Sequence, residues 1–314
     1  MKPLRKNVAL AIDGGGIRGV IVAKALAMVE QELQQPLSRL CRLVAGTSTG
    51  AIITTAIASG MTASQLFDLY VLLGKTIFKK TWRSHFFPLT RYRYSPEPLK
   101  SQLSKHLGSR KMSDFWLASP PTDVVITAFD LIRNHTCFIK PWKTEYADWS
   151  IEQAVLASSS VPTYFPPVLG RYVDGGVGSY ANPCYLAAYE SQFCLNWNPN
   201  ETTLISLGTG RSPHSIHNPQ AILKLSPWEW ISPMFGAFMQ SADDQQVHLV
   251  HNFFPEIDFR RFQIDLQQPF EMDDVDKIDQ LAAYGEDLGR MILNDTLDPI
   301  LDISTPKAPV KISK

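Results

Sequence analysis

A glycine-rich turn near the start of the chain restricts the choice of fold more than any other part of the sequence. In the segment NVALAIDGGGIRGV, residues 7–20, an apolar run typical of a strand ends at Asp13, and an alanine-rich segment typical of a helix follows three glycines. Gly14, Gly16 and Gly19 satisfy the G-x-G-x-x-G spacing of a dinucleotide-binding turn. This strand–turn–helix unit leaves two functions open for the turn, which are to cradle a phosphate or to present amides to another negative charge.

Strand and helix patterns alternate along the rest of the chain. The expected strands cover about 7–13, 41–45, 122–130, 168–173 and 202–207. The expected helices cover about 18–33, 49–59, 62–73, 97–107, 151–158, 182–190, 230–250 and 275–293. The alternation predicts an α/β fold with a mainly parallel sheet covered by helices, and a site at the carboxyl ends of the strands. For a chain of 314 residues we expect one domain over 1–300 and a loose tail over 301–314.

Charge and cysteine content exclude several classes of protein. The chain has 30 Lys and Arg and 30 Asp and Glu, so no overall field favours nucleic acid, and any membrane contact has to be local. The apolar run after the basic N-terminal residues stops at Asp13, which argues against a signal peptide, and no apolar run is long enough to span a bilayer. We expect a cytoplasmic protein, at most peripheral at a membrane surface. The cysteines lack disulfide or zinc spacing and are expected to be reduced core residues; they are Cys41, Cys137, Cys184 and Cys194.

A second strand–turn–helix unit lies in LCRLVAGTSTGAII, residues 40–53. Gly46, Ser48 and Gly50 form the G-x-S-x-G pattern of a nucleophile elbow, a sharp turn that lifts the serine hydroxyl above the sheet edge. The same turn places the amide of Thr49 at the start of a helix, where it can stabilise an oxyanion. Because this second strand ends in a serine, it lacks the acidic residue that would hold the ribose of a dinucleotide.

The second turn therefore changes the interpretation of the first. If both turns lie at one sheet edge, the amides of Gly14, Gly15 and Gly16 face Ser48 and bind developing negative charge, with Arg18 fixing the loop.

A reactive serine needs a base, and Asp174 is the candidate. It ends an apolar stretch and is followed by Gly175 and Gly176, which let another backbone approach closely. Burial would raise its pKa enough for a base; the alternative is a turn carboxylate that caps local amides. The downstream histidines are interpreted as surface or structural residues; they are His214, His217, His248 and His251.

Five motifs occur in order along the chain. They are D-G-G-G-I-R-G (13–19), G-T-S-T-G (46–50), A-S-S-S-V-P-T-Y-F-P-P (157–167), D-G-G (174–176) and S-L-G-T-G (206–210). Together they resemble the patatin-like phospholipases. The resemblance implies a three-layer α/β/α fold and lipid acyl hydrolase activity through a Ser48–Asp174 dyad, with no metal or cofactor. It also implies that the glycine loop supplies the oxyanion amides.

The implied substrate is a phospholipid or a related acyl lipid, hydrolysed through an acyl-enzyme. The alternatives are an acyltransferase of the same fold, a lipid-binding or storage protein with little turnover, and a nucleotide-binding module.

Two further segments each have an ordinary interpretation, as a solvated loop and as a core helix, and each also has a functional interpretation. The basic and aromatic segment 75–94 would touch anionic headgroups, and the aromatic segment 228–239 would line an acyl groove or form a lid.

Overall fold

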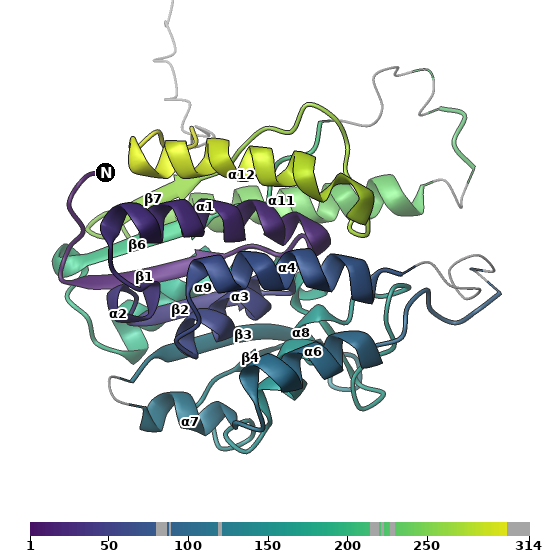
Figure 1. Cartoon of the computed structure of the whole chain (residues 1–314), viewed down its shortest axis with the longest axis horizontal. Helices are drawn as coiled ribbons and strands as arrows, with labels where there is room; N and C mark the ends of the chain where they lie inside the picture. The colour runs from purple at the N-terminus through teal and green to yellow at the C-terminus, as the bar shows by residue number, and fades with distance from the viewer. Residues whose placement is uncertain are drawn as a thin grey trace, which may run out of the picture.

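A computed structural model of the protein has a single sheet of seven strands at its centre (Figure 1). The residues that the structure describes are 1–79, 87, 89–118, 121–213, 220, 223–226 and 230–299. The strands are β1 (Asn7–Ile12), β2 (Leu43–Thr47), β3 (Asp123–Asp130), β4 (His135–Ile139), β5 (Tyr172–Asp174), β6 (Thr202–Leu207) and β7 (Asp258–Phe262). Their order across the sheet is β4-β3-β2-β1-β6-β7, and β5 pairs with β3.

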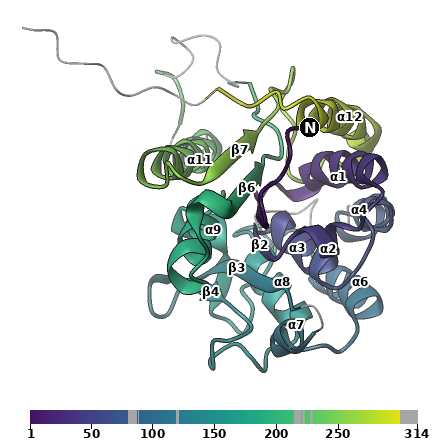
Figure 2. The same ribbon diagram turned by 90° about the vertical axis from the view of Figure 1, so that its left-hand side faces the viewer.

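Helices cover both faces of the sheet, so the three-layer α/β/α fold is confirmed (Figure 2). One face carries α1 (Gly19–Leu33), α2 (Leu37–Leu40), α3 (Thr49–Ala58), α4 (Ala63–Ile77), α6 (Glu97–Leu107), α7 (Met112–Leu117), α8 (Ile151–Ser159) and α12 (Ile278–Leu293). The other face carries α9 (Cys184–Tyr189) and α11 (Ile231–Phe253). Within the described part of the chain, no helix combines the length and apolar character that crossing a bilayer requires.

The alternation of side chains along β1 shows how the two faces differ. Val8, Leu10 and Ile12 belong to the larger core beneath α1 and α3, whereas Ala9 and Ala11 belong to the smaller core beneath α9. Successive side chains of a strand point to opposite faces, and both faces of this central strand are buried. The near-continuous apolar run that predicted this strand therefore reflects burial on two sides.

The sheet is mainly parallel, as expected, but it has two antiparallel members. β1, β2, β3, β6 and β7 run parallel to one another, while β4 and β5 both run antiparallel to β3. The strand expected at 168–173 is only partly formed. Residues 168–171 make a tight turn instead, and the strand β5 begins after it, at Tyr172. β4 and β7 were not expected from the sequence pattern.

The register of the sheet places four loops at one edge. Ser48 follows the carboxyl end of β2, and the glycine loop follows β1, its parallel neighbour. Thr47 pairs with Thr127 of β3, and the next residue of β3, Ala128, pairs with Asp174. Although β5 runs the other way, Asp174 therefore lies at the level of Ser48. The S-L-G-T-G segment, which starts in the last two residues of β6, reaches the same edge.

Candidate active site

Ser48 occupies a sharp turn between β2 and α3. Its φ of 56° and ψ of −119° lie in a region that non-glycine residues seldom adopt. The surrounding structure holds this conformation, because the Ser48 amide donates to Ser158 Oγ at 2.8 Å and the Ser48 carbonyl accepts from Ser159 Oγ at 3.2 Å. Gly50 lets α3 lie directly against β1, since a Cβ at this position would sit 2.1 Å from the Ile12 carbonyl oxygen. These contacts have the form that a nucleophile elbow requires.

Asp174 is buried beside Ser48 at the end of β5 and starts a short 3-10 helix, η2 (Gly175–Gly178). Its Oδ1 accepts the Gly176 amide at 2.8 Å. Its Oδ2 is buried without a hydrogen bond of ordinary geometry among the described residues, although the Ser48 side chain interacts closely enough to lower the carboxyl pKa. Burial outweighs both of these contacts and raises the pKa of Asp174 to about 6. One oxygen therefore caps the turn, and the other remains available to take a proton.

The glycine loop lies against Ser48, but it differs from the expectation at one residue. The amide of Gly14 donates to the Ala181 carbonyl at 2.8 Å, so it is not free to bind an oxyanion. A Cβ on Gly14 would lie only 3.3 Å from the Ser48 Cβ, which shows how closely the two turns approach. In the described structure the amides of Gly15, Gly16 and Thr49 donate no hydrogen bond. The three free amides of the site thus come from two different turns.

Neighbouring residues hold the loop in this position. Arg18 donates through Nε to the Gly15 carbonyl at 3.3 Å and through Nη1 to the Gly210 carbonyl at 3.1 Å, which supports the expectation that it fixes the loop. Thr209, in the S-L-G-T-G motif, donates to the Gly14 carbonyl at 2.7 Å. Tyr70 donates to the Thr49 carbonyl at 2.8 Å, a contact that the sequence did not predict. Other motif glycines permit close packing that a Cβ would block; they are Gly19, Gly46 and Gly175.

A buried ion cluster lies behind the glycine loop, and it was also not predicted. Arg261 of β7 is almost fully buried and donates to both carboxylate oxygens of Asp13, with Nη1 at 3.0 Å from Oδ1. The same guanidinium donates to Asp243 of α11 at 2.9 Å and to Ser206 of β6 at 2.8 Å. Burial and the nearby Asp243 raise the pKa of Asp13 to about 7, while Arg261 lowers it. The arginine therefore joins the start of the glycine loop to β6, β7 and α11.

An apolar groove opens beside Ser48 and encloses about 520 Å³, including its open mouth. Its lining residues come from both turns, from α3, α4 and α6, from the end of α8 and the segment after it, and from the loop between β7 and α12; they are Gly16, Ile17, Ser48, Thr49, Ile52, Tyr70, Leu73, Ile77, Phe78, Leu99, Ser159, Val161, Tyr164, Phe165 and Met272. None of these residues is charged. The groove thus joins the candidate nucleophile to a space suited to an apolar chain.

The two segments with a proposed lipid role are only partly described. Ile77 and Phe78 of the basic and aromatic segment line the groove, but residues 80–86 and 88 lie outside the described residues. In the aromatic segment 228–239, residues 228–229 lie outside the described residues, and Trp230 and Met234 are partly exposed. Neither of these two described side chains lines the groove.

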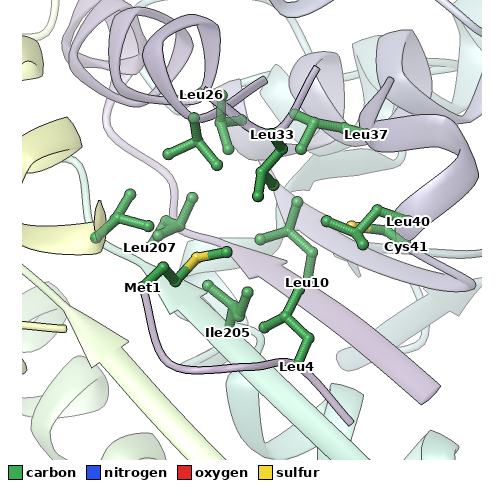
Figure 3. A pocket seen from close by; sticks show the side chains of 12 residues that line it. Met1, Leu4, Leu10, Leu26, Leu33, Leu37, Leu40, Cys41, Ile205 and Leu207 are labelled. Atoms are coloured by element: carbon green, nitrogen blue, oxygen red, sulfur yellow. The ribbon is translucent and has the colours of Figure 1, made fainter. Parts of the chain in front are cut away.

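A second hollow lies beneath the N-terminal segment and encloses about 360 Å³, including its open mouth (Figure 3). Met1, Leu4 and Leu10 line it together with α1 and α2 side chains, all of them apolar apart from the thiol of Cys41. Burial raises the pKa of Cys41 to about 12, so this thiol stays protonated and unreactive. The hollow therefore offers no group for catalysis, and the edge that carries Ser48 remains the candidate site.

The cysteines and the described downstream histidines lie outside the candidate active site. Cys41, Cys137 and Cys184 are buried free thiols, as expected, whereas Cys194 is exposed because it lies in the last turn after α9. On α11, His248 pairs with the amide of its neighbour Asn252 at 2.7 Å. His251 is exposed on the same helix, and His214 and His217 lie outside the described residues. Among the residues that the structure describes, no group of three or more His, Cys, Asp or Glu side chains is placed to hold a metal ion.

Comparison with known proteins gives a family match over more than half of the chain. Residues 10–188 match the family described as Patatin-like phospholipase. The human protein named calcium-independent phospholipase A2-gamma is 27% identical over 306 residues, which cover 88% of this chain and 37% of that protein. Patatin-like protein 2 of Arabidopsis thaliana is 27% identical over 344 residues, covering 89% of this chain and 82% of that protein. The crystal structure of VipD from Legionella pneumophila aligns with a TM-score of 0.47 and 13% identity, covering 93% of this chain and 67% of that chain.

Proposed function

The chain belongs to the patatin-like phospholipase family, and from this premise we propose that it is a lipid acyl hydrolase that cleaves carboxylic esters of phospholipids or related acyl lipids. One observation carries the proposal. Asp174 is buried, its Oδ2 has no hydrogen bond of ordinary geometry among the described residues, and its carboxyl interacts with the side chain of Ser48, which lines an apolar groove. An unpaired buried carboxylate costs stability, and a protein that only binds or stores lipid has no need of one.

In the first step, Ser48 Oγ attacks the acyl carbonyl carbon while its proton passes to Asp174 Oδ2. The carbonyl oxygen becomes an oxyanion, and the amides of Gly15, Gly16 and Thr49 are the donors that stabilise it. When the tetrahedral intermediate collapses, the ester C–O bond breaks and Asp174 returns the proton to the departing alcohol or lysolipid. A serine acyl-enzyme remains.

In the second step, Asp174 takes a proton from water as the water oxygen attacks the acyl-enzyme. The same amides hold the second oxyanion, and Asp174 then returns the proton to Ser48 Oγ as the fatty acid leaves. If an alcohol replaces water here, the same residues perform acyl transfer. Loss of a single oxyanion donor costs about 100-fold to 1,000-fold in kcat in other acyl-transfer enzymes, so the amide geometry contributes to the rate in addition to the dyad.

The uncharged groove accommodates the acyl chain of the substrate. Ile77 and Phe78 of α4 and its C-terminus form one part of its wall, and Tyr164 and Phe165 form another. Burying a long acyl chain against such side chains releases about 0.8 kcal/mol for each methylene, which favours long-chain lipids over short esters.

The proposal is tested by measuring fatty acid release from phospholipid micelles and hydrolysis of a soluble short-chain ester. We expect the Ser48→Ala and Asp174→Asn proteins to lose at least about 1,000-fold in kcat on both substrates, because each change removes a reacting group. Ser59→Ala is the matched control, since its hydroxyl lies at the far end of α3 and makes no hydrogen bond to any residue that the structure describes. A Ser48→Ala protein with undiminished activity would overturn the assignment.

A further inference from the structure

Two adjacent loop tips expose large aliphatic side chains to solvent. The turn between β3 and β4 carries Leu131, which is 49% exposed, and Ile132, which is 72% exposed. The turn before β5 carries Leu169, also 72% exposed. The tips lie side by side, because the Leu131 amide donates to the Arg171 carbonyl at 3.0 Å. We call Leu131, Ile132 and Leu169 the aliphatic tip.

A single buried carboxylate holds the two turns together. Asp130 Oδ1 accepts the amides of Ile132 at 2.9 Å and Arg133 at 3.1 Å, while Oδ2 accepts Arg171 Nε at 2.8 Å. The Arg171 guanidinium holds the pKa of Asp130 well below its usual range, so the carboxylate stays ionised. The aliphatic tip is therefore fixed before any partner binds, which reduces the entropy cost of binding.

Folding alone does not account for aliphatic residues at these positions. Leu169 has a φ of 53°, in the left-handed region that favours glycine or asparagine, and Gly170 beside it has a φ of 64°. Turns of this kind usually carry polar residues. Ile132 and Leu169, at 72% exposed, add little to the core, and Leu131 is half exposed beside them, so the three side chains on neighbouring tips indicate an apolar partner outside the chain.

The aliphatic tip lies at the same sheet edge as the candidate active site. β3 runs parallel to β2, and Thr127 is level with Thr47, so the turn after Asp130 extends roughly 10 Å beyond the level of Ser48. The turn before β5 continues the wall of the groove. Val161, Tyr164 and Phe165 line the groove, and the chain runs from them into Leu169.

The charges around the aliphatic tip suit an anionic surface. Arg133 and Lys143 are both about half exposed and share one carboxylate, that of Glu145, at 3.1 Å and 3.9 Å. These three side chains thus carry two positive charges against one negative charge, although the net charge of the whole chain is zero. Cations next to exposed aliphatic side chains favour the interface of a bilayer that contains anionic lipid.

We propose that the aliphatic tip is a docking surface for a lipid bilayer, on which Leu131, Ile132 and Leu169 insert at the interface and bring the groove to its substrate. The inference rests on the proposed function, because a hydrolase of membrane lipids needs its groove to open toward the membrane. Docking uses residues that take no part in the chemical steps, so binding and catalysis can be measured separately.

The experiment measures vesicle binding by flotation, using mixed phosphatidylcholine and phosphatidylglycerol vesicles and the Ser48→Ala protein, which cannot consume the lipid. Added to that background, Ile132→Asp and Leu169→Asp are each expected to lower the partition coefficient about tenfold, and Ile132→Trp to raise it. Leu117→Asp is the matched control, because this leucine is 79% exposed on α7, ahead of the amino end of β3, and should leave binding unchanged.

With Ser48 intact, the same substitutions should leave hydrolysis of a soluble short-chain ester unchanged. Equal loss of binding in the Leu117→Asp protein, wild-type binding by both tip variants, or no binding by the Ser48→Ala protein would each overturn the docking surface. If the tip variants lose binding while the wild-type protein fails to hydrolyse the soluble ester, the docking surface is supported and the hydrolase assignment is wrong.

Discussion

Asp174 has to be both buried and ionised, and this conflict has a measurable consequence. Because burial raises its pKa to about 6, the carboxylate is deprotonated at neutral pH yet is a far better base than an ordinary aspartate. We expect kcat/KM on a soluble ester to be half-maximal at about pH 6 and to fall about tenfold for each pH unit below that, because the base must be deprotonated. A profile that stays flat down to about pH 4 would mean that another group acts as the base.

The same raised pKa predicts an effect on stability. In the unfolded chain an aspartate ionises near its ordinary pKa of 3.8, so the raised pKa in the folded protein costs stability as pH rises through about 6. Asp174→Asn keeps an oxygen for the Gly176 amide and removes this cost. We expect the variant to be up to about 3 kcal/mol more stable than the wild type at about pH 8 and no more stable at about pH 4, by urea denaturation.

Asp130 provides a control, because its ionisation should change the stability of the protein in the opposite direction. Its pKa is held low in the folded protein, so its ionisation contributes stability that is present above the unfolded pKa and lost as pH falls. Asp130→Asn should therefore be destabilising at neutral pH, with a smaller effect in acid. If both variants changed stability in the same direction at neutral pH, the opposite environments inferred for the two carboxylates would be wrong.

At the level of elements, β7 and α11 stabilise the site through Arg261. Arg261→Met would leave Asp13 and Asp243 buried without their cation, and breaking a buried ion pair in this way typically costs about 3–5 kcal/mol. Adding Asp243→Asn removes one of the two orphaned charges and should recover part of the loss. Urea denaturation measures both changes.

The matched control is Arg290→Met on α12, where the arginine is 57% exposed and pairs with Asp287 on the surface. We expect this change to cost less than about 1 kcal/mol. Similar losses for the Arg290 and Arg261 variants would show that the buried cluster has no special role in holding the glycine loop.

The end of α4 sets part of the groove wall, which leads to a prediction about chain length. Ile77→Trp places a larger ring in the groove and should lower kcat/KM for long-chain esters at least about tenfold, while short esters react as before. Leu72→Trp on the exposed side of the same helix is the control. A Leu72 variant with the same selectivity, or an Ile77 variant without it, would place the acyl chain elsewhere.

For the whole molecule, the sequence predicted the layers, most of the helices and the convergence of Ser48 and Asp174. Apolar runs and glycine turns report burial and local geometry, which are properties of short segments. β7 was missed because its sequence, DFRRF, contains Arg261, whose burial depends on Asp13 and Asp243, residues remote in the chain. Motif spacing likewise could not show that the Gly14 amide is already bound to Ala181.

These omissions have a common physical cause. Polar contacts between residues remote in the chain decide which backbone amides and charged side chains already have a hydrogen-bond partner. Such contacts leave no periodic pattern in the sequence. The exposed residues Leu131, Ile132 and Leu169 were missed for a similar reason. Solvent exposure at a turn depends on what packs around it, so an aliphatic residue there looks the same in sequence as a core residue.

The most direct test of Ser48 as the nucleophile is covalent labelling with a fluorophosphonate probe, followed by intact mass and peptide mapping. We expect a single addition to the wild-type protein at Ser48, none to Ser48→Ala, and much slower addition to Asp174→Asn, because the probe needs an activated serine and a free oxyanion site. Addition at another residue, or equal labelling of the Ser48→Ala protein, would contradict the assignment of Ser48 as the nucleophile.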